Sequence, residues 1–335
     1  MDTVHTGRIA KWDHTKLFLI ICVVMGHMLS RYLKTSGTAK AVYYFVYLFH
    51  MPAFVMVSGL FSKRVIQQKK YDKIFGYLVL YFFIIFVNFV AVYAFKGKIS
   101  LKLFSDSSPA WYAFAMFAYF LMTVFLQQFS KKFVFMFAVV MGCMAGYDSS
   151  IGNFLAISRI ITFYPFFLMG YYLDSNEILQ FVQKKYIQII AAAVLVCTAV
   201  FVYRNVDQIY WTMNLLKGKY TYDTLDEYVQ YGAVLRLFFY VVSTVLSFSV
   251  IAVMPSRRYF FSYMGERTLS VYALHMFFVY LFFDGMKGGA FLRSIWPEHY
   301  LVLIVLVSFM MVVLLSWKPL NHLVTRICFP QKIKQ

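Results

Sequence analysis

The sequence predicts an all-α integral membrane protein with about ten transmembrane helices, and two observations support this fold class. Of its 335 residues, 61% are hydrophobic, 21% are aromatic and only 14% are charged, a balance that is foreign to soluble globular domains. Ten apolar runs also approach the length of about 20 residues that a helix needs to cross a bilayer. These runs are 17–33, 41–61, 74–95, 110–126, 133–147, 160–173, 187–203, 232–254, 268–284 and 300–317.

The distribution of charge predicts how these helices are oriented. A net charge of +18 could indicate a nucleic-acid partner, but an N-terminus in the cytosol places most Lys and Arg residues on the cytosolic side. This asymmetry follows the positive-inside rule, so we expect both termini inside and no nucleic-acid binding. We expect one transmembrane domain over 8–320, a short basic cytoplasmic tail over 321–335, and no soluble domain.

The first run carries the most informative residue of the chain, His27. Lys16 precedes it by eleven residues, and eleven steps of 100° return to nearly the same helix face about 16 Å further along. Asp13 lies one turn before Lys16 and can pair with it. Ionisable groups inside a membrane helix usually face a protein interior or a water-filled cavity, so this column marks a candidate site.

The second run passes back through the membrane and contains Phe49-His50-Met51-Pro52, followed by Ser58-Gly59. His50 then lies near the middle of the bilayer, as His27 does, on an adjacent antiparallel helix. Pro52 lacks a backbone N–H and frees a carbonyl near His50, an irregularity that is tolerated where the backbone faces protein or water.

The segment after the second run holds the strongest orientation signal, the basic cluster Lys63, Arg64, Lys69, Lys70 and Lys73. Two interpretations of this cluster remain open. It can anchor the protein to anionic lipids, or part of it can hold a phosphorylated ligand.

Aromatic and basic residues mark the outer ends of later runs. Trp111 and Tyr112 begin the fourth run, where an aromatic belt is an ordinary explanation for them. Arg159 precedes the sixth run, and a snorkelling arginine would account for it. The polar stretch 204–231 is rich in Tyr and acidic residues, which suits either contact with sugars or a membrane-interface belt.

The ninth run begins with Glu266 and Arg267 at its inner mouth and carries His275 about two turns deeper. The four cysteines have neither the spacing of metal ligands nor a pairing pattern, so we expect no metal site and no disulfide.

Four motifs in order resemble those of the membrane acyltransferase family 3, and the similarity spans about residues 8–320. The motifs are Asp13-x-x-Lys16-x10-His27, Phe49-His50-Met51-Pro52 with Ser58-Gly59, Pro109-x-Trp111-Tyr112, and Thr268-Leu269-Ser270-x-Tyr272-x-Leu274-His275. Within this family, the chain most resembles the fucose 4-O-acetylase-like branch. Much of the family carries Arg at the position of Lys16, whereas the fucose 4-O-acetylase-like branch resembles this chain in carrying Lys there. Lysine is a point charge that cannot form the bidentate fork of arginine.

The resemblance implies a ten-helix enzyme of the bacterial plasma membrane. Such an enzyme transfers acetyl groups from cytosolic acetyl-CoA to hydroxyls of extracytoplasmic or lipid-linked glycans. Acetyl-CoA would be a substrate, with no permanently bound cofactor. Other glycan-assembly proteins are expected partners besides the lipid bilayer.

The same resemblance implies roles for individual side chains. His27 would act as general base or accept the acetyl group itself. His50 would orient His27, bind the acceptor or stabilise the oxyanion. The donor phosphates would be held by Lys16, Arg267, Lys63 and Arg64, with Asp13 positioning Lys16. The acceptor side would consist of Trp111, Tyr112, Arg159 and His275.

Two other function classes are compatible with the sequence. A transporter or flippase would use His27, His50 and Lys16 to line a substrate path, and it would favour an internal repeat, which we do not find. A non-catalytic membrane partner in a glycan-assembly complex would tolerate replacement of both His27 and His50.

Overall fold

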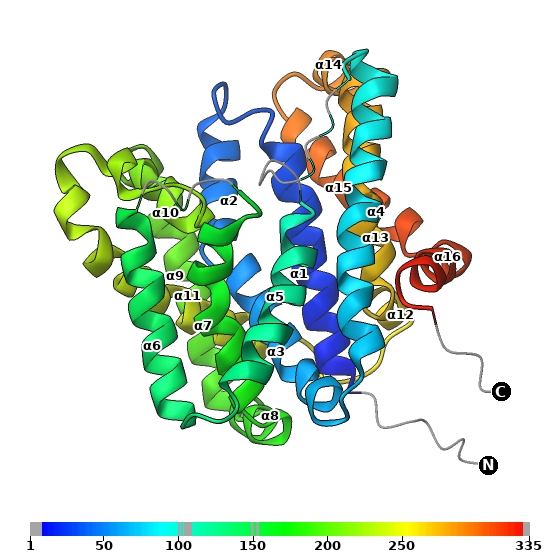
Figure 1. Ribbon diagram of the computed structural model, residues 1–335. Coiled ribbons are helices and arrows are strands. Elements are labelled where there is room, and N and C mark those ends of the chain that lie inside the picture. Colours follow the sequence, from blue (N-terminus) through cyan, green and yellow to red (C-terminus); the bar gives the residue numbers. More distant parts are fainter. Residues whose placement is uncertain are drawn as a thin grey trace.

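The computed structural model describes residues 9–99, 101, 103, 109–148, 151 and 154–330, and their regular structure is helical (Figure 1). The α-helices are α1 Ala10–Leu29, α2 Gly37–Tyr47, α3 His50–Gln67, α4 Tyr71–Lys96, α5 Trp111–Leu126, α6 Lys131–Met144, α7 Ile157–Tyr172, α8 Ser175–Val182, α9 Lys185–Ile209, α10 Met213–Lys217, α11 Gly232–Val253, α12 Ser262–Glu266, α13 Thr268–Tyr280, α14 Gly288–Ile295, α15 Tyr300–Leu315 and α16 Lys318–Cys328. The predicted all-helical fold is therefore confirmed for the described residues.

The number of membrane spans is a separate question. Within the described residues, six helices are long and apolar enough to cross a membrane, or seven if α15 and α16, which meet at 67°, count as one bent span. Every predicted run overlaps a helix, but α5, α6 and α7 are shorter than a full span. The count of ten spans stays a prediction.

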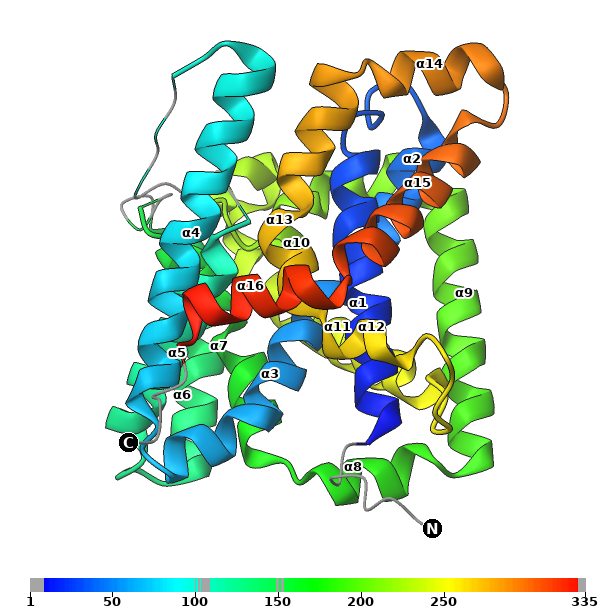
Figure 2. The ribbon, with the colours of Figure 1, turned by 90° about the vertical axis from the view of Figure 1, so that its right-hand side faces the viewer.

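Helix α1 runs through the interior of the bundle (Figures 1 and 2). It packs against α2, α3, α11, α12, α13 and α15. Because neighbours cover most of its surface, its apolar residues do not gather on one face. The helix begins at Ala10 and ends at Leu29 rather than covering 17–33, so Lys16 lies inside it and His27 falls in its last turn.

The predicted second helix is broken into α2 and α3, with the break between Tyr47 and His50. His50 is the first residue of α3, and Pro52 lies in the first turn, where a missing N–H leaves no helical bond unmade. The His50 Nδ1–H donates to the Val46 carbonyl at 2.9 Å, and the Phe49 backbone N–H donates to the same oxygen. The imidazole of His50 is therefore fixed against the end of α2.

Helices α3 and α7 cross in close backbone contact. A Cβ atom at Gly59 would overlap the carbonyl of Phe167, and one at Gly170 would overlap the carbonyl of Met56. Small residues at such crossings let membrane helices approach closely. This crossing holds α3, and with it His50 and Ser58, against α7.

Two segments differ from their predicted form. The polar stretch 204–231 is largely helical, because α9 continues to Ile209 and α10 and a 3₁₀ segment Tyr222–Tyr231 follow it. In the predicted tail, residues up to Cys328 belong to α16, which packs across α4 and α13 (Figure 2). Residue 8 and residues 331–335 lie outside the described part of the chain.

Candidate active site

Three cavities surround α1, and we name each after one residue. The His27 cavity has a volume of about 300 Å³ and lies toward the C-terminal end of α1. The Lys16 cavity, about 790 Å³, and the Lys63 cavity, about 690 Å³, lie toward its N-terminal end. Lys16 lines both of the latter, so the two residues of the predicted column, Lys16 and His27, face cavities at opposite ends of one helix.

The His27 cavity collects the predicted catalytic residues and all predicted acceptor-side residues except His275. His27 comes from α1, His50 from α3, Trp111 and Tyr112 from α5, and Arg159 from α7. The Arg159 guanidinium lies 4.7 Å from the Trp111 ring centroid, a cation–π geometry. Residues far apart in the sequence are thus brought together as predicted.

His275 lies behind His27 and outside the cavity lining, although the sequence analysis placed it on the acceptor side. Its side chain is fully buried, and its ring centroid lies 5.1 Å from that of His27. Its Nδ1–H donates to the carbonyls of Val271 and Tyr272, and its Nε2 has no hydrogen-bond partner within the described chain. Because carbonyls only accept, Nδ1 carries the proton and the Nε2 lone pair stays available beside His27.

Phe54, Tyr112 and Tyr272 line both the His27 cavity and the Lys16 cavity, and we call them the aromatic wall. The Tyr112 ring packs edge-on against the other two, with centroids 5.4 Å and 5.3 Å away. Its hydroxyl lies 2.6 Å from Ser58 Oγ. The Tyr272 hydroxyl donates to the Pro109 carbonyl at 2.6 Å. Three of the predicted motifs therefore meet in one partition between two cavities.

Basic side chains outnumber acidic ones in the described lining of each of the other two cavities. Lys16 forms an ion pair with Asp13 at 2.8 Å, as predicted. Lys63 and Arg64 line the Lys63 cavity. Lys70 and Lys73, two members of the basic cluster whose role the sequence analysis left open, also line the Lys16 cavity.

A family model described as an acyltransferase domain matches residues 9–318. The chain belongs to the membrane acyltransferase family 3. No curated protein and no solved structure gives a significant match. The acyltransferase domain covers nearly the whole chain, and together with the apolar helices it identifies a multi-pass membrane acyltransferase.

Arg267 of the acyltransferase does not join the basic residues around Lys16. The described lining of the three cavities does not include it. Its Nη1 donates to the Ser316 carbonyl at 3.3 Å, and its guanidinium lies over the Tyr263 ring at 4.7 Å. Arg267 caps the end of α15, so its predicted contact with donor phosphates gains no support.

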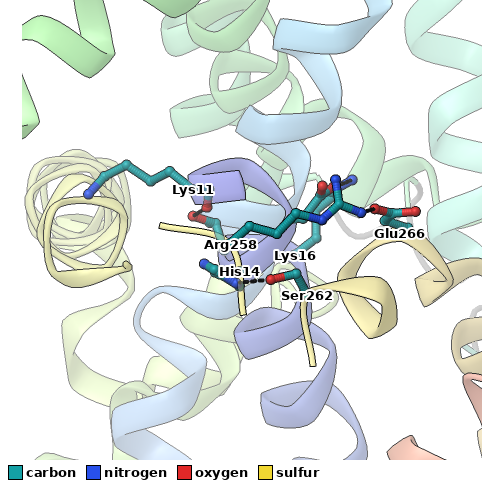
Figure 3. A network of polar contacts seen from close by, with 8 residues as sticks. Lys11, His14, Lys16, Arg258, Ser262 and Glu266 are labelled. Atoms are coloured by element: carbon teal, nitrogen blue, oxygen red, sulfur yellow. Dashed lines mark hydrogen bonds and ion pairs between the residues drawn. The ribbon is translucent and has the colours of Figure 1, made fainter. Parts of the chain in front are cut away.

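A polar network ties the segment before α13 to the N-terminal end of α1 (Figure 3). The buried Lys11 ammonium donates to the carbonyls of Ala252 and Met254 at the end of α11. His14 bridges the Pro255 carbonyl and Ser262 Oγ at 2.9 Å and 2.7 Å. These contacts fix α1 against α11 and α12, and thereby hold Lys16 in place.

The sequence analysis missed Lys217 and Lys219, which line the His27 cavity together with Tyr220. They come from the polar stretch 204–231, for which the sequence analysis left open either contact with sugars or a membrane-interface belt. The signal available in the sequence was Lys217-Gly218-Lys219, a turn flanked by two cations.

Proposed function

We propose that the acyltransferase transfers an acetyl group from cytosolic acetyl-CoA to a hydroxyl of an extracytoplasmic or lipid-linked glycan. One observation carries this proposal. The His27 cavity and the Lys16 cavity lie toward opposite ends of α1 and share the aromatic wall. This arrangement suits a donor and an acceptor that approach one reaction centre from opposite sides of a membrane.

The donor would bind at the N-terminal end of α1, which the positive-inside rule assigns to the cytosol. Coenzyme A carries several phosphate charges, and Lys16, Lys63 and Arg64 offer cations around two adjoining cavities. Lys70 and Lys73 add positive charge at the same end. The thin pantetheine arm would extend past the aromatic wall and bring the thioester to His27.

The reaction needs a general base, and it forms one bond and breaks another. His27 would take the proton of the acceptor hydroxyl while the hydroxyl oxygen attacks the thioester carbonyl. A C–O bond forms and the C–S bond breaks, and the thiolate of coenzyme A then takes the proton from His27. In the covalent variant the imidazole attacks first and passes the acetyl group on. Intact mass measured in a single turnover without acceptor separates the two routes.

The hydrogen bonds of the other histidines narrow the roles that were open at the sequence level. His50 donates its Nδ1–H to the Val46 carbonyl, so the Nε2 atom of its neutral ring can only accept a hydrogen bond. We therefore propose that Nε2 accepts a hydrogen bond from the glycan hydroxyl and does not donate to an oxyanion. The orientation of His27 would depend instead on His275, whose ring lies against it.

The chain carries lysine at position 16, as the fucose 4-O-acetylase-like branch does, and we propose that it belongs to that branch. The Lys16 ammonium is paired with Asp13, which leaves a point charge suited to phosphate rather than a bidentate clamp. A plasma-membrane location in a bacterium would place acetyl-CoA and the growing glycan on the two required sides.

The test is acetyl-CoA consumption by the purified, detergent-solubilised protein with a bacterial glycan extract as acceptor. We expect His27→Ala to lower transfer by at least about 10²-fold, since general bases contribute that much or more. His322→Ala is the matched control, because His322 is exposed on α16. Transfer by a folded His27→Ala protein at the wild-type rate would refute the mechanism.

A further inference from the structure

We propose that α16 completes the donor site, and that the Thr325 hydroxyl on this helix forms a hydrogen bond with an amide group of the pantetheine arm of acetyl-CoA. This inference rests on the proposed function, because it adds an element and a contact to the same donor cavity. The matched family domain ends at residue 318, where α16 begins, so membership of the family does not account for this helix.

The Lys16 cavity is elongated along α3. Its lining residues from α3 lie between Phe54 and Val65, and eleven residues of helix extend about 16 Å. Phe54 belongs to the aromatic wall at one end. At the other end, the Lys70 backbone N–H donates to the Val65 carbonyl, and Lys70 and Lys73 line the cavity. This length, with lysines at one end, suits an extended ligand such as coenzyme A, whose pantetheine arm joins the phosphates to the thioester.

Both ends of α16 are fastened to the helices that flank this cavity, α13 and α4 (Figure 2). Near the start of α16, Asn321 Oδ1 lies 3.4 Å from Ser270 Oγ on α13. Just after its end, the Phe329 ring packs edge-on against the Tyr77 ring of α4, with the centroids 5.2 Å apart. A Cβ atom at Gly76 would overlap the Phe329 ring. Helix α16 is therefore a fixed side of the cavity.

The two faces of α16 have different surroundings. Val324 and Cys328 are buried, whereas Leu323, Arg326 and Ile327 are exposed. An exposed face that combines apolar and basic side chains is typical of a helix that lies in the plane of the membrane interface. The bend of 67° between α15 and α16 fits a change from a membrane-crossing to an in-plane direction. In this position α16 would separate the donor cavity from the surrounding lipid.

Thr325 brings a hydroxyl from α16 to the cavity lining, beside the apolar Phe329 and Pro330. This hydroxyl has no hydrogen-bond partner within the described chain. The pantetheine arm carries amide groups, and an amide that leaves water without gaining a partner costs free energy. A hydroxyl can donate to an amide carbonyl or accept from an amide N–H. Thr325 can therefore satisfy either group of an arm that extends toward the aromatic wall.

The affinities of two probes test the contact. The purified full-length protein is titrated with acetyl-CoA and with adenosine 3′,5′-bisphosphate, which carries nucleotide phosphates but lacks the pantetheine arm. We expect Thr325→Val to raise Kd for acetyl-CoA about three- to tenfold, the effect of losing one hydrogen bond, and to leave Kd for the bisphosphate unchanged. Thr325→Ser keeps the hydroxyl and should bind acetyl-CoA as the wild type does.

Thr38→Val is the matched control, because it makes the same change at an exposed position of α2 outside the described lining of the three cavities. Unchanged affinity of Thr325→Val for acetyl-CoA would overturn the contact. An equal loss of affinity for both probes, or an equal loss in Thr325→Ser and Thr325→Val, would overturn it as well.

Alkylation tests the position of α16 separately. The cysteine of a Thr325→Cys variant should lose its reactivity toward N-ethylmaleimide when acetyl-CoA is saturating, as measured on the corresponding peptide by mass spectrometry. Leu323→Cys lies on the exposed face of the same helix and should react equally with and without acetyl-CoA. Equal reactivity of Thr325→Cys under both conditions would show that α16 does not border the bound donor.

The outcomes also distinguish this inference from the proposed function. Acetyl transfer that depends on His27, together with wild-type binding of acetyl-CoA by Thr325→Val, would overturn only the part assigned to α16. A folded wild-type protein that binds neither acetyl-CoA nor the bisphosphate would overturn both.

Discussion

Two of the three histidines near the reaction centre are tied to the backbone in the same way. His50 and His275 each donate Nδ1–H to the carbonyl four residues earlier in the sequence, Val46 and Val271. These bonds fix the ring planes and leave Nε2 as the free nitrogen. No ring hydrogen bond holds His27 within the described chain, so its orientation depends on packing against His275. A base that must carry and release a proton benefits from this arrangement.

His275 should act as a positioning residue for His27. We expect His275→Leu to lower kcat for acetyl transfer by about 10²-fold while KM for acetyl-CoA stays unchanged, because a misoriented base reduces the rate and leaves donor binding intact. His275→Gln keeps a polar end group near the position of Nε2 and should restore much of the rate. An equal loss in both variants, with unchanged melting temperatures, would argue against positioning.

At the residue scale, helical periodicity predicts which side chains of one helix lie on the same face, but it does not predict contacts between distant segments. Asp13, Lys16 and His27 share one helix, so their ion pair and their common column followed from spacing alone. Tertiary packing places His275 against His27 and brings Lys217 into the lining of the same cavity. No periodicity along the chain encodes that proximity. For Arg267 the sequence analysis expected a contact with the donor phosphates because the residue adjoins a motif, but its side chain caps the end of α15 instead.

At the scale of elements, the crossing of α3 and α7 positions the site. The backbones touch at Gly59 and Gly170, which leaves no room for a side chain at either position. Both helices contribute to the His27 cavity, through His50 on α3 and Arg159 on α7. The separation between these two groups is therefore set by two glycines that do not line the cavity.

Gly59→Ala should force α3 and α7 apart and destabilise the protein by about 1–3 kcal/mol, the range for overpacked sites. The melting temperature in detergent should fall accordingly, and acetyl transfer should fall with it. Gly37→Ala is the matched control, because no atom lies within 4 Å of the added methyl group at this exposed helix start. Equal melting temperatures for the two variants would show that the crossing tolerates a wider spacing.

Element boundaries were harder to predict than element types. The apolar runs located the helices, but the run 41–61 gave no sign that α2 ends at Tyr47. Pro52 indicated an irregularity a few residues too late, because proline in a first helical turn starts a helix as readily as it kinks one. The polar stretch 204–231 had no apolar periodicity to mark α10, whose placement depends on Arg236 and Ser158 from distant helices.

At the scale of the whole molecule, cavities lie toward both ends of α1. The Lys16 and Lys63 cavities lie toward its N-terminal end and the His27 cavity toward the opposite end, and in the proposed reaction they would serve as two approaches to one centre. The aromatic wall separates them, and Tyr272 ties it to the loop before α5 through Pro109. In the proposed reaction the wall limits the access of water to the thioester as the acetyl group passes to the acceptor.

Opening the wall should uncouple consumption of the donor from transfer. We expect Phe54→Ala to raise the ratio of coenzyme A released to acetyl ester formed by several-fold, because water then reaches the thioester in competition with the glycan hydroxyl. Phe61→Ala removes the same ring from the Lys16 cavity without touching the wall and should leave the ratio unchanged. An unaltered ratio in Phe54→Ala would mean that these rings do not seal the site.

The aromatic wall also has a consequence for proton leakage across the membrane. If the His27 cavity and the Lys16 cavity were filled with water, open to opposite faces of a charged membrane and joined, they would form a path for protons down the electrochemical gradient. The rings of Phe54, Tyr112 and Tyr272 interrupt that path with apolar surface, and the two tyrosine hydroxyls are engaged with Ser58 and Pro109. In the proposed reaction, an acetyl group would thus cross the bilayer without opening a path for protons.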